Sequence, residues 1–144
     1  MSRWFQAFAL TNPSCPAVSM ALHILVVEND TDVRETLVEM LTSSGFLTTQ
    51  ADGGTAMREV LTGKGLAVDA IVLDCKMAGE PSAQLALHAK QLHLPVVMIS
   101  GSPEAIEFAR ENELQLLHKP FRIADLQGAI EAAMASGKFG QRGG

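Results

Sequence analysis

The stretch His23–Arg34, HILVVENDTDVR, joins a short apolar run directly to a polar, mostly acidic cluster. The run is rich in Val, Ile and Leu, as is typical of a strand that is covered on both faces. The cluster is Glu28, Asn29 and Asp30, and it is followed by residues of helical period. The stretch therefore predicts a buried strand that leads into a helix, with polar side chains at the mouth of the strand.

The same alternation of an apolar run and a helical segment is found five times between residues 22 and 136. It predicts a doubly wound α/β fold, (βα)5, in which a parallel five-stranded sheet carries helices on both faces. The first, third and fourth runs are the most apolar and belong in the middle of the sheet, whereas the second run fits an edge. The predicted strands are HILVVE (23–28), FLTTQA (46–51), VDAIVLD (68–74), PVVMIS (95–100) and LQLLHK (114–119).

One domain with a tail at each end is predicted from the length and composition. The chain has 144 residues, of which 47% are hydrophobic, enough to bury one core without disulfides. Residues 1–21 are predicted to be an N-terminal tail that is disordered or precedes an alternative start at Met20; a signal peptide is the weaker alternative. The domain spans residues 22–136, and the Gly-rich segment 137–144 is predicted to be a frayed C-terminal tail.

Charge and cysteine content exclude several classes of protein. The 11 basic residues against 16 acidic residues give a net charge of -5, with no basic block between aromatic residues, which argues against direct binding of nucleic acid. No run reaches the roughly 18 apolar residues of a membrane span. Cys15 and Cys75 lie in different contexts, which fits a reducing cytoplasm. For Cys75, core packing is favoured over a role as a redox thiol.

Four predicted strands end in polar side chains. Right-handed crossovers place the carboxyl ends of parallel strands at one edge, where open α/β sheets bind their ligands. Crowded carboxylates at such an edge favour a hard divalent cation, with Mg²⁺ as the natural candidate. A carboxylate beside the cation could accept a phosphoryl group, whose charge a lysine and a hydroxyl would meet. The residues are Glu28 to Asp30, Asp74, Ser100 and Lys119.

The motifs around these residues are ILVVEND, IVLDCKMAG, VVMISGS and LLHKPF. In this order they resemble the response regulator receiver domains of two-component signalling, over Leu22 to about Ser136. The resemblance implies the flavodoxin-like strand order 2-1-3-4-5, Asp74 as the phosphoacceptor, and a cis Lys119–Pro120 bond. It also implies that Ser100 hydrogen-bonds the phosphoryl group and that Lys119 contacts it. The Mg²⁺ ligands implied are Glu28, Asn29, Asp74 and the backbone carbonyl of Lys76.

The sequence departs from the family pattern at several positions. Asn29 stands where the family has its metal-proximal acid, which predicts weaker Mg²⁺ binding because an amide carries no charge. Ala78 replaces the usual proline, and Pro81–Ser82 replace the usual Asp-Gly. Leu116 replaces the aromatic switch residue, so the output must be coupled to Ser100 in another way.

Four functions can be compared on these residues. The leading hypothesis is a stand-alone receiver, not an enzyme, that takes a phosphoryl group from a sensor histidine kinase or a phosphotransfer protein. It would signal to an unidentified protein through its fourth helix, fifth strand and fifth helix, with a homodimer left open. The alternative is a degenerate receiver that binds its partner unphosphorylated. A magnesium-dependent phosphatase would need an acid where Lys76 stands, and a dinucleotide-binding enzyme would need a Gly-rich first turn.

A purely structural role for the acidic cluster also stays open. Asn29 or Asp30 could simply cap the first helix, because Asn and Asp side chains accept the unpaired amide hydrogens of a helix start. Capping and metal binding are compatible with each other.

Overall fold

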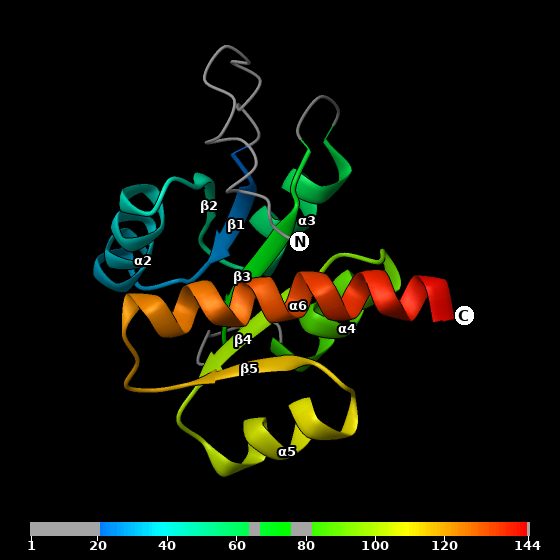
Figure 1. Ribbon diagram of the computed structural model, residues 1–144. Helices are drawn as coiled ribbons and strands as arrows, with labels where there is room; N and C mark the ends of the chain where they lie inside the picture. The colour runs from blue at the N-terminus through cyan, green and yellow to red at the C-terminus, as the bar shows by residue number, and fades with distance from the viewer. Residues whose placement is uncertain (1–20, 64–66, 76–81, 144) are drawn as a thin grey trace, which may run out of the picture.

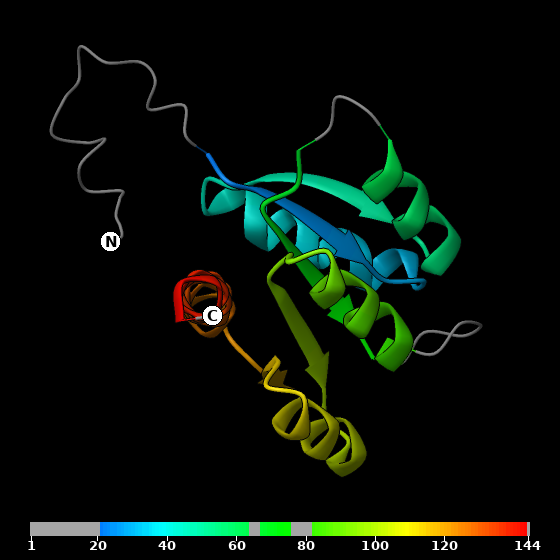
Figure 2. The same cartoon turned by 90° about the vertical axis from the view of Figure 1, so that its right-hand side faces the viewer.

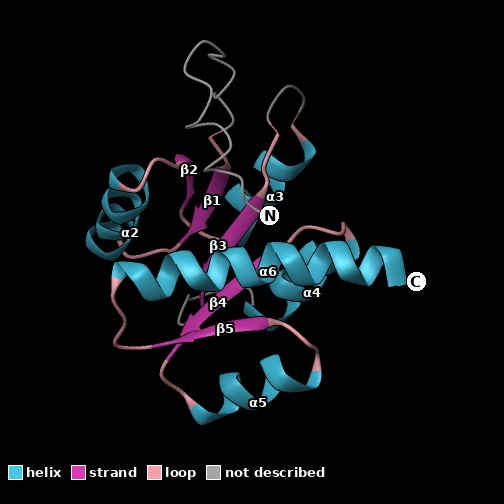
Figure 3. Ribbon diagram, in the orientation of Figure 1, coloured by secondary structure: helices cyan, strands magenta, loops and turns pink. Residues whose placement is uncertain are grey.

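The structure is a computed structural model that describes residues 21–63, 67–75 and 82–143. In this part of the chain, five strands alternate with five helices (Figures 1 and 3). The elements are β1 (His23–Val27), α2 (Thr31–Ser43), β2 (Leu47–Ala51), α3 (Gly54–Thr62), β3 (Ala70–Asp74), α4 (Ser82–Gln91), β4 (Val96–Ser100), α5 (Pro103–Glu111), β5 (Gln115–His118) and α6 (Ile123–Gly143). The predicted (βα)5 alternation is confirmed.

The five strands form one parallel sheet in the order β2-β1-β3-β4-β5. This confirms the flavodoxin-like order 2-1-3-4-5. Every residue of β3 and of β4 is buried, whereas Leu47 at the start of the edge strand β2 is 56% exposed. The placement of the most apolar runs inside the sheet and of the second run at an edge is therefore confirmed as well, because only inner strands have neighbours on both sides.

Helices cover both faces of the sheet (Figure 2). Alternate residues of each strand point to opposite faces, so neighbouring side chains of β1 enter different cores. Ile24 and Val26 pack with α2 and α6, whereas Leu25 and Val27 pack with α3, α4 and α5. The sheet is thus packed between two apolar layers, which fix the position of the carboxyl ends of its strands.

Some boundaries differ from those that the sequence predicts. Each predicted strand is one or two residues longer than the observed one, so Glu28 and Lys119 follow their strands rather than end them. The helix α6 continues to Gly143, past the frayed end that was predicted from residue 137. Glycine lowers helix propensity without removing a backbone donor, as proline would, so it does not oblige a helix to stop.

The N-terminal tail remains a prediction, since residues 1–20 lie outside the described residues. Among the helices that are described, none combines the length and the apolar character needed to cross a bilayer.

Candidate functional site

Polar residues gather where β1, β3, β4 and β5 end. The strand register sets Val27 opposite Leu73, so the next residues along the two strands, Glu28 and Asp74, are neighbours. On the other side of β3, Asp74 lies opposite Ile99. The pairing of β4 with β5 continues one residue beyond β5, because the Lys119 N–H donates to the Ser100 carbonyl at 3.0 Å. The sheet therefore brings the four strand ends to one edge, as predicted.

Asp74 and Lys119 form a direct ion pair. The Nζ atom of Lys119 donates to Oδ2 of Asp74 at 3.0 Å, although 45 residues separate them in the chain. Asp74 is only 2% exposed, whereas the Lys119 side chain is 33% exposed. Because water screens a largely buried carboxylate less than one on the open surface, the attraction between Asp74 and Lys119 is stronger than in an exposed ion pair. Of the two partners, Lys119 is thus the one in contact with solvent.

Glu28 is buried beside Asp74 and is 3% exposed. Burial and the hydrogen bond with the Asp74 carboxyl group raise its pKa from the ordinary 4.5 to about 7, against the lowering effect of the Asp30 N–H and of Lys119. The Asp30 N–H donates to Oε2 of Glu28 at 2.8 Å. Burial and a second carboxyl group thus both disfavour the charged form of Glu28.

Asn29 and Asp30 follow Glu28 and are both exposed. Asp30 is the N-cap of α2, where its Oδ1 accepts the Val33 N–H at 3.0 Å. The capping role that the sequence left open thus belongs to Asp30. Because its carboxylate is held against the start of α2, we do not expect Asp30 to bind Mg²⁺ in place of the family acid that Asn29 replaces.

Ser100 is 1% exposed at the end of β4. Its Oγ accepts the Ser102 N–H at 2.9 Å. Ser102 is in turn the N-cap of α5, where its Oγ accepts the Ala105 N–H at 3.0 Å. A serine hydroxyl accepts and donates at once, so accepting from Ser102 does not use the Ser100 proton.

Other predicted positions are only partly covered by the structure. Lys76 and Ala78 lie outside the described residues, as does Pro81. The Lys119–Pro120 peptide bond is cis, as the family resemblance implies. Leu116, in the place of the aromatic switch residue, is half-buried against the core beneath α3, α4 and α5.

Two further side chains, which the sequence did not predict, hold the site together. Ser82, at the start of α4, is buried, and its hydroxyl donates to the Asp74 carbonyl at 3.1 Å. Arg34, in α2, donates from Nη1 to the Glu28 carbonyl at 2.8 Å. Their positions in the sequence could have indicated this role. Each residue lies in the first turns of a helix that follows a strand of the site, where a long or polar side chain can hydrogen-bond the end of that strand.

The residues that are present fit Mg²⁺. In the described ranges there is no group of three or more His, Cys, Asp or Glu side chains that could hold a metal ion. Glu28 and Asp74 are two neighbouring buried carboxyl groups, and burial together with the Asp74 carboxyl group raises the pKa of Glu28 even though Lys119 lowers it, so a cation between them would stabilise their charged forms. A hard cation that keeps several waters needs only one or two carboxylates. This donor set fits such an ion, with Asn29 as a neutral neighbour.

Cys75 follows Asp74 and is half-buried against the core. Burial, with a further contribution from the Asp74 charge, raises the pKa of its thiol to about 11. The thiolate is the reactive form of cysteine, and it is scarce at neutral pH when the pKa is so high. The preference for a packing role over a redox role is therefore supported.

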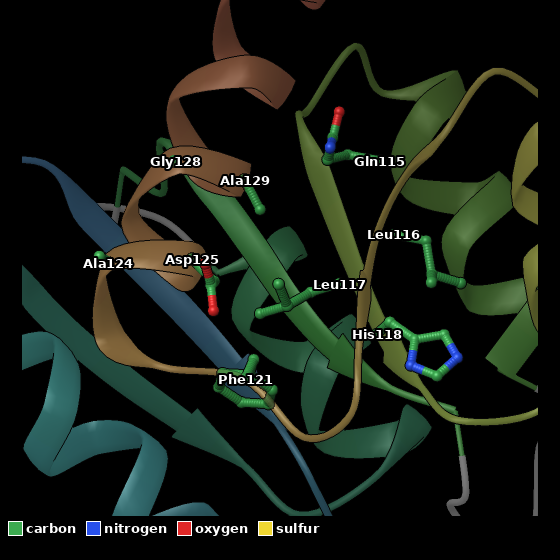
Figure 4. Close-up of a pocket in the computed structure, with 9 residues that line it drawn as sticks. All are labelled: Gln115, Leu116, Leu117, His118, Phe121, Ala124, Asp125, Gly128 and Ala129. Atoms are coloured by element: carbon green, nitrogen blue, oxygen red, sulfur yellow. The ribbon is translucent and has the colours of Figure 1, made fainter.

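A shallow hollow of about 480 Å³ lies beside the site, between β5 and the first turns of α6 (Figure 4). In the close-up, Leu117 points toward α6, whereas Leu116 lies on the other side of the strand. The floor includes small residues of α6, which leave the edge strand β5 accessible from this side. The lining residues are Gln115, Leu116, Leu117, His118, Phe121, Ala124, Asp125, Gly128 and Ala129.

The fold and this cluster define a class of α/β domains that carry an acidic site at the carboxyl edge of a parallel sheet. The family model of the response regulator receiver domain matches residues 24–131. The chain belongs to this family, and it is a receiver domain of two-component signalling. Receiver domains are signalling modules that are not generally classed as enzymes.

Individual relatives agree with the family match. The chain is 31% identical over 117 residues to the transcriptional regulatory protein FixJ of Bradyrhizobium diazoefficiens, covering 78% of this chain and 56% of FixJ. It thus spans about half the length of the curated relatives it matches. A response regulator receiver protein from Sinorhizobium medicae is 27% identical, with a TM-score of 0.68, over 83% of this chain and 98% of that chain. A receiver domain protein from Clostridium thermocellum, 21% identical, shares the fold with a TM-score of 0.73, over 82% and 98% of the two chains.

Proposed function

We propose that this receiver accepts a phosphoryl group on Asp74 from the phosphohistidine of a sensor histidine kinase or a phosphotransfer protein, with Mg²⁺, in the cytoplasm. The observation that carries the proposal is the joint placement of Asp74, Glu28 and Lys119. A buried carboxylate lies 3.0 Å from an ammonium group on one side and is hydrogen-bonded to a second acid on the other.

In the proposed step, an Asp74 carboxylate oxygen forms a bond to phosphorus while the bond from phosphorus to the imidazole nitrogen of the donor breaks. That nitrogen keeps the electron pair of the broken bond and takes a proton from solvent. The product is an acyl phosphate on Asp74. Lys119 holds the carboxylate before the step and meets the negative charge of the phosphoryl oxygens after it, because its ammonium group already lies at hydrogen-bond distance.

Access to Asp74 requires a small local movement. The Asp74 side chain is 2% exposed, and it is paired with the partly exposed Lys119 side chain. A long, flexible ammonium chain can move aside with little loss of packing. We therefore expect Lys119 to turn away from Oδ2 as the donor approaches, and to return to the phosphoryl oxygens.

Mg²⁺, when bound, would neutralise charge on the transferring phosphoryl group. Glu28 and Asp74 would hold it, together with Asn29 and the Lys76 carbonyl that the family resemblance implies. An amide in place of a carboxylate lowers the charge of the ligand set, and cation affinity depends on that charge. The proposed site is accordingly a weak one.

The proposed output surface is formed by α5, β5 and α6. The proposed partner is a downstream protein, or a second copy of this chain that pairs through the same surface. Ser100 links the site to this surface, because its hydroxyl accepts the N–H of the residue that caps α5. A phosphoryl group that takes a hydrogen bond from Ser100 would thus act on the start of α5. This route does not need an aromatic side chain at Leu116.

The test is incubation of the full chain with a small phosphodonor, such as acetyl phosphate, and Mg²⁺, followed by intact mass measurement. Wild type should gain one phosphoryl mass, and Asp74→Asn should gain none. Asp32→Asn is the matched control, because Asp32 is an exposed carboxylate in the first turn of α2 and should not affect uptake. Unlabelled wild type at saturating donor and Mg²⁺ would contradict the proposal.

A degenerate receiver that binds its partner unphosphorylated is the second candidate. Asn29 at the metal turn and Leu116 beneath α5 favour it, since both replace residues that the phosphorylation cycle of the family uses. The same experiment separates the two functions, because a degenerate receiver takes up no phosphoryl group whether or not Mg²⁺ is present.

A further inference from the structure

Arg34 connects three parts of the molecule near the site, although the proposed chemistry does not use it. It lies in α2 and is half-buried. Its Nη1 donates to the Glu28 carbonyl at 2.8 Å, and its Nε donates to Oε1 of Gln50 on β2 at 3.0 Å. One guanidinium group thus ties the end of β1 to the edge strand beside it.

The backbone on either side of Glu28 is held from two directions. The Glu28 N–H donates to the Ala51 carbonyl at 3.0 Å, which continues the pairing with β2 beyond the last residue of β1. The Glu28 carbonyl is the acceptor for Arg34. The Arg34 N–H also donates to the Asp30 carbonyl at 2.9 Å, so side chain and backbone of one residue fasten both ends of the turn.

The orientation of this carbonyl determines where the turn points its side chains. The peptide bond is planar, so fixing the Glu28 carbonyl also fixes the N–H of Asn29. Glu28 and Asn29 flank that peptide, and both are proposed Mg²⁺ ligands. A neutral ligand such as Asn29 attracts Mg²⁺ only weakly by charge, so Mg²⁺ affinity depends more on whether the ligand is already held in the binding geometry. Residues behind the metal ligands can hold them in this way.

From these contacts, and on the basis of the proposed function, we infer that Arg34 is the positioning residue of the magnesium turn. Through the Glu28 carbonyl it fixes the peptide that joins Glu28 to Asn29, and Gln50 fixes the guanidinium in turn. The planar fork of arginine donates in both directions at once. Lysine keeps the charge but cannot reproduce this geometry.

The experiment is a Mg²⁺ titration of the full chain, followed by the amide NMR signals of residues 28–30, for wild type, Arg34→Lys and Gln50→Ala. We expect Arg34→Lys to weaken Mg²⁺ binding about tenfold, at the lower end of the range seen for groups behind metal ligands, and Gln50→Ala to weaken it less, because Gln50 acts one step further from the ligands. The Arg34→Lys/Gln50→Ala double variant should be no weaker than Arg34→Lys alone, because Gln50 acts through Arg34.

Phosphoryl uptake from acetyl phosphate gives a second measurement. The Mg²⁺ concentration for half-maximal rate should rise by the same factor as the dissociation constant, while the rate at saturating Mg²⁺ stays within about twofold. A merely structural role would instead lower the melting temperature and leave Mg²⁺ affinity unchanged. Arg110→Gln is the matched control, since Arg110 pairs with Glu107 on the exposed side of α5.

Two results would overturn the inference: Mg²⁺ affinity within twofold of wild type in both Arg34→Lys and Gln50→Ala, or an equal loss in Arg110→Gln. Gln50 is exposed on the edge strand, so its variant keeps the test decisive if Arg34→Lys fails to fold. Failure of the proposed function looks different, because wild type itself would then bind no Mg²⁺ and take up no phosphoryl group.

Discussion

The turn after β1 and the turn after β4 are built in the same way, from different chemistry. In each, the side chain that follows or ends the strand accepts the N–H of the residue two positions later: Glu28 from Asp30 at 2.8 Å, and Ser100 from Ser102 at 2.9 Å. In each, that later residue caps the next helix with its own side chain. One turn presents an ionisable group beside Asp74, and the other presents a neutral hydroxyl.

The difference shows that two turns with the same backbone hydrogen bonds can have different functions. Both turns satisfy the amide groups at a helix start in the same manner. Of these two turns, the one after β1 lies beside a second carboxyl group, where burial raises the pKa of Glu28 and a cation would stabilise its charged form. We assign metal binding to the β1 turn and the link to α5 to the β4 turn.

The largest expected effect separates these two assignments. Glu28→Gln keeps an oxygen that can accept the Asp30 N–H but removes the charge of a proposed ligand, so it should weaken Mg²⁺ binding by more than the roughly tenfold loss expected for a group behind a ligand. Ser100→Ala should leave Mg²⁺ affinity within about twofold, although it takes the acceptor from a Ser102 N–H and so lowers stability. Calorimetric Mg²⁺ titration measures both. Equal losses in the two variants would remove the distinction between the turns.

The next effect is a pH dependence that belongs to the β1 turn alone. The pKa of Glu28 is about 7 in the folded protein and near 4.5 when unfolded, so the folded state holds its proton more tightly. The stability contribution of this group is therefore full below pH 4.5 and is lost as the pH rises through about 7. The loss should be of the order of 1–2 kcal/mol after allowance for solvent screening.

Urea unfolding in Mg²⁺-free buffer from pH 4.5 to 8 checks this dependence. Glu28→Gln should flatten the part of the profile that lies between those limits, since the group that titrates is gone. Ser100→Ala should lower the whole profile without changing its shape. If wild type and Glu28→Gln show parallel profiles, the raised pKa is not a property of Glu28.

The smallest expected effect tests what the two turns share. Asp30→Ala and Ser102→Ala each remove a helix cap and should each cost about 1 kcal/mol of unfolding free energy. Urea unfolding at pH 8, where Glu28 is mostly ionised, measures both losses on one scale. A loss in Asp30→Ala far above that in Ser102→Ala would mean that Asp30 also acts in the acidic cluster.

Much of the fold and part of the site could be predicted from the sequence. Periodicity and apolar content are local properties, and they were sufficient to predict five strands and the inner position of β1, β3 and β4. They also predicted the common edge at which Asp74 and Ser100 end their strands and Glu28 and Lys119 follow theirs. Strand ends were placed less well, because the choice of the last paired residue depends on the neighbouring strand. The continuation of α6 to Gly143 was missed because glycine only weakens a helix.

The order of apolar runs and of the polar residues that follow them was enough to predict which chemical groups reach the carboxyl edge, because parallel strands joined by right-handed crossovers end on one side. Which of these groups touch one another depended on packing between strands. The contact of Lys119 with Asp74 joins residues 45 apart, and that of Arg34 with Gln50 joins residues 16 apart. Such contacts, and the proton that burial leaves on Glu28, depend on distance and on exclusion of water across several strands, which no local pattern of residues encodes.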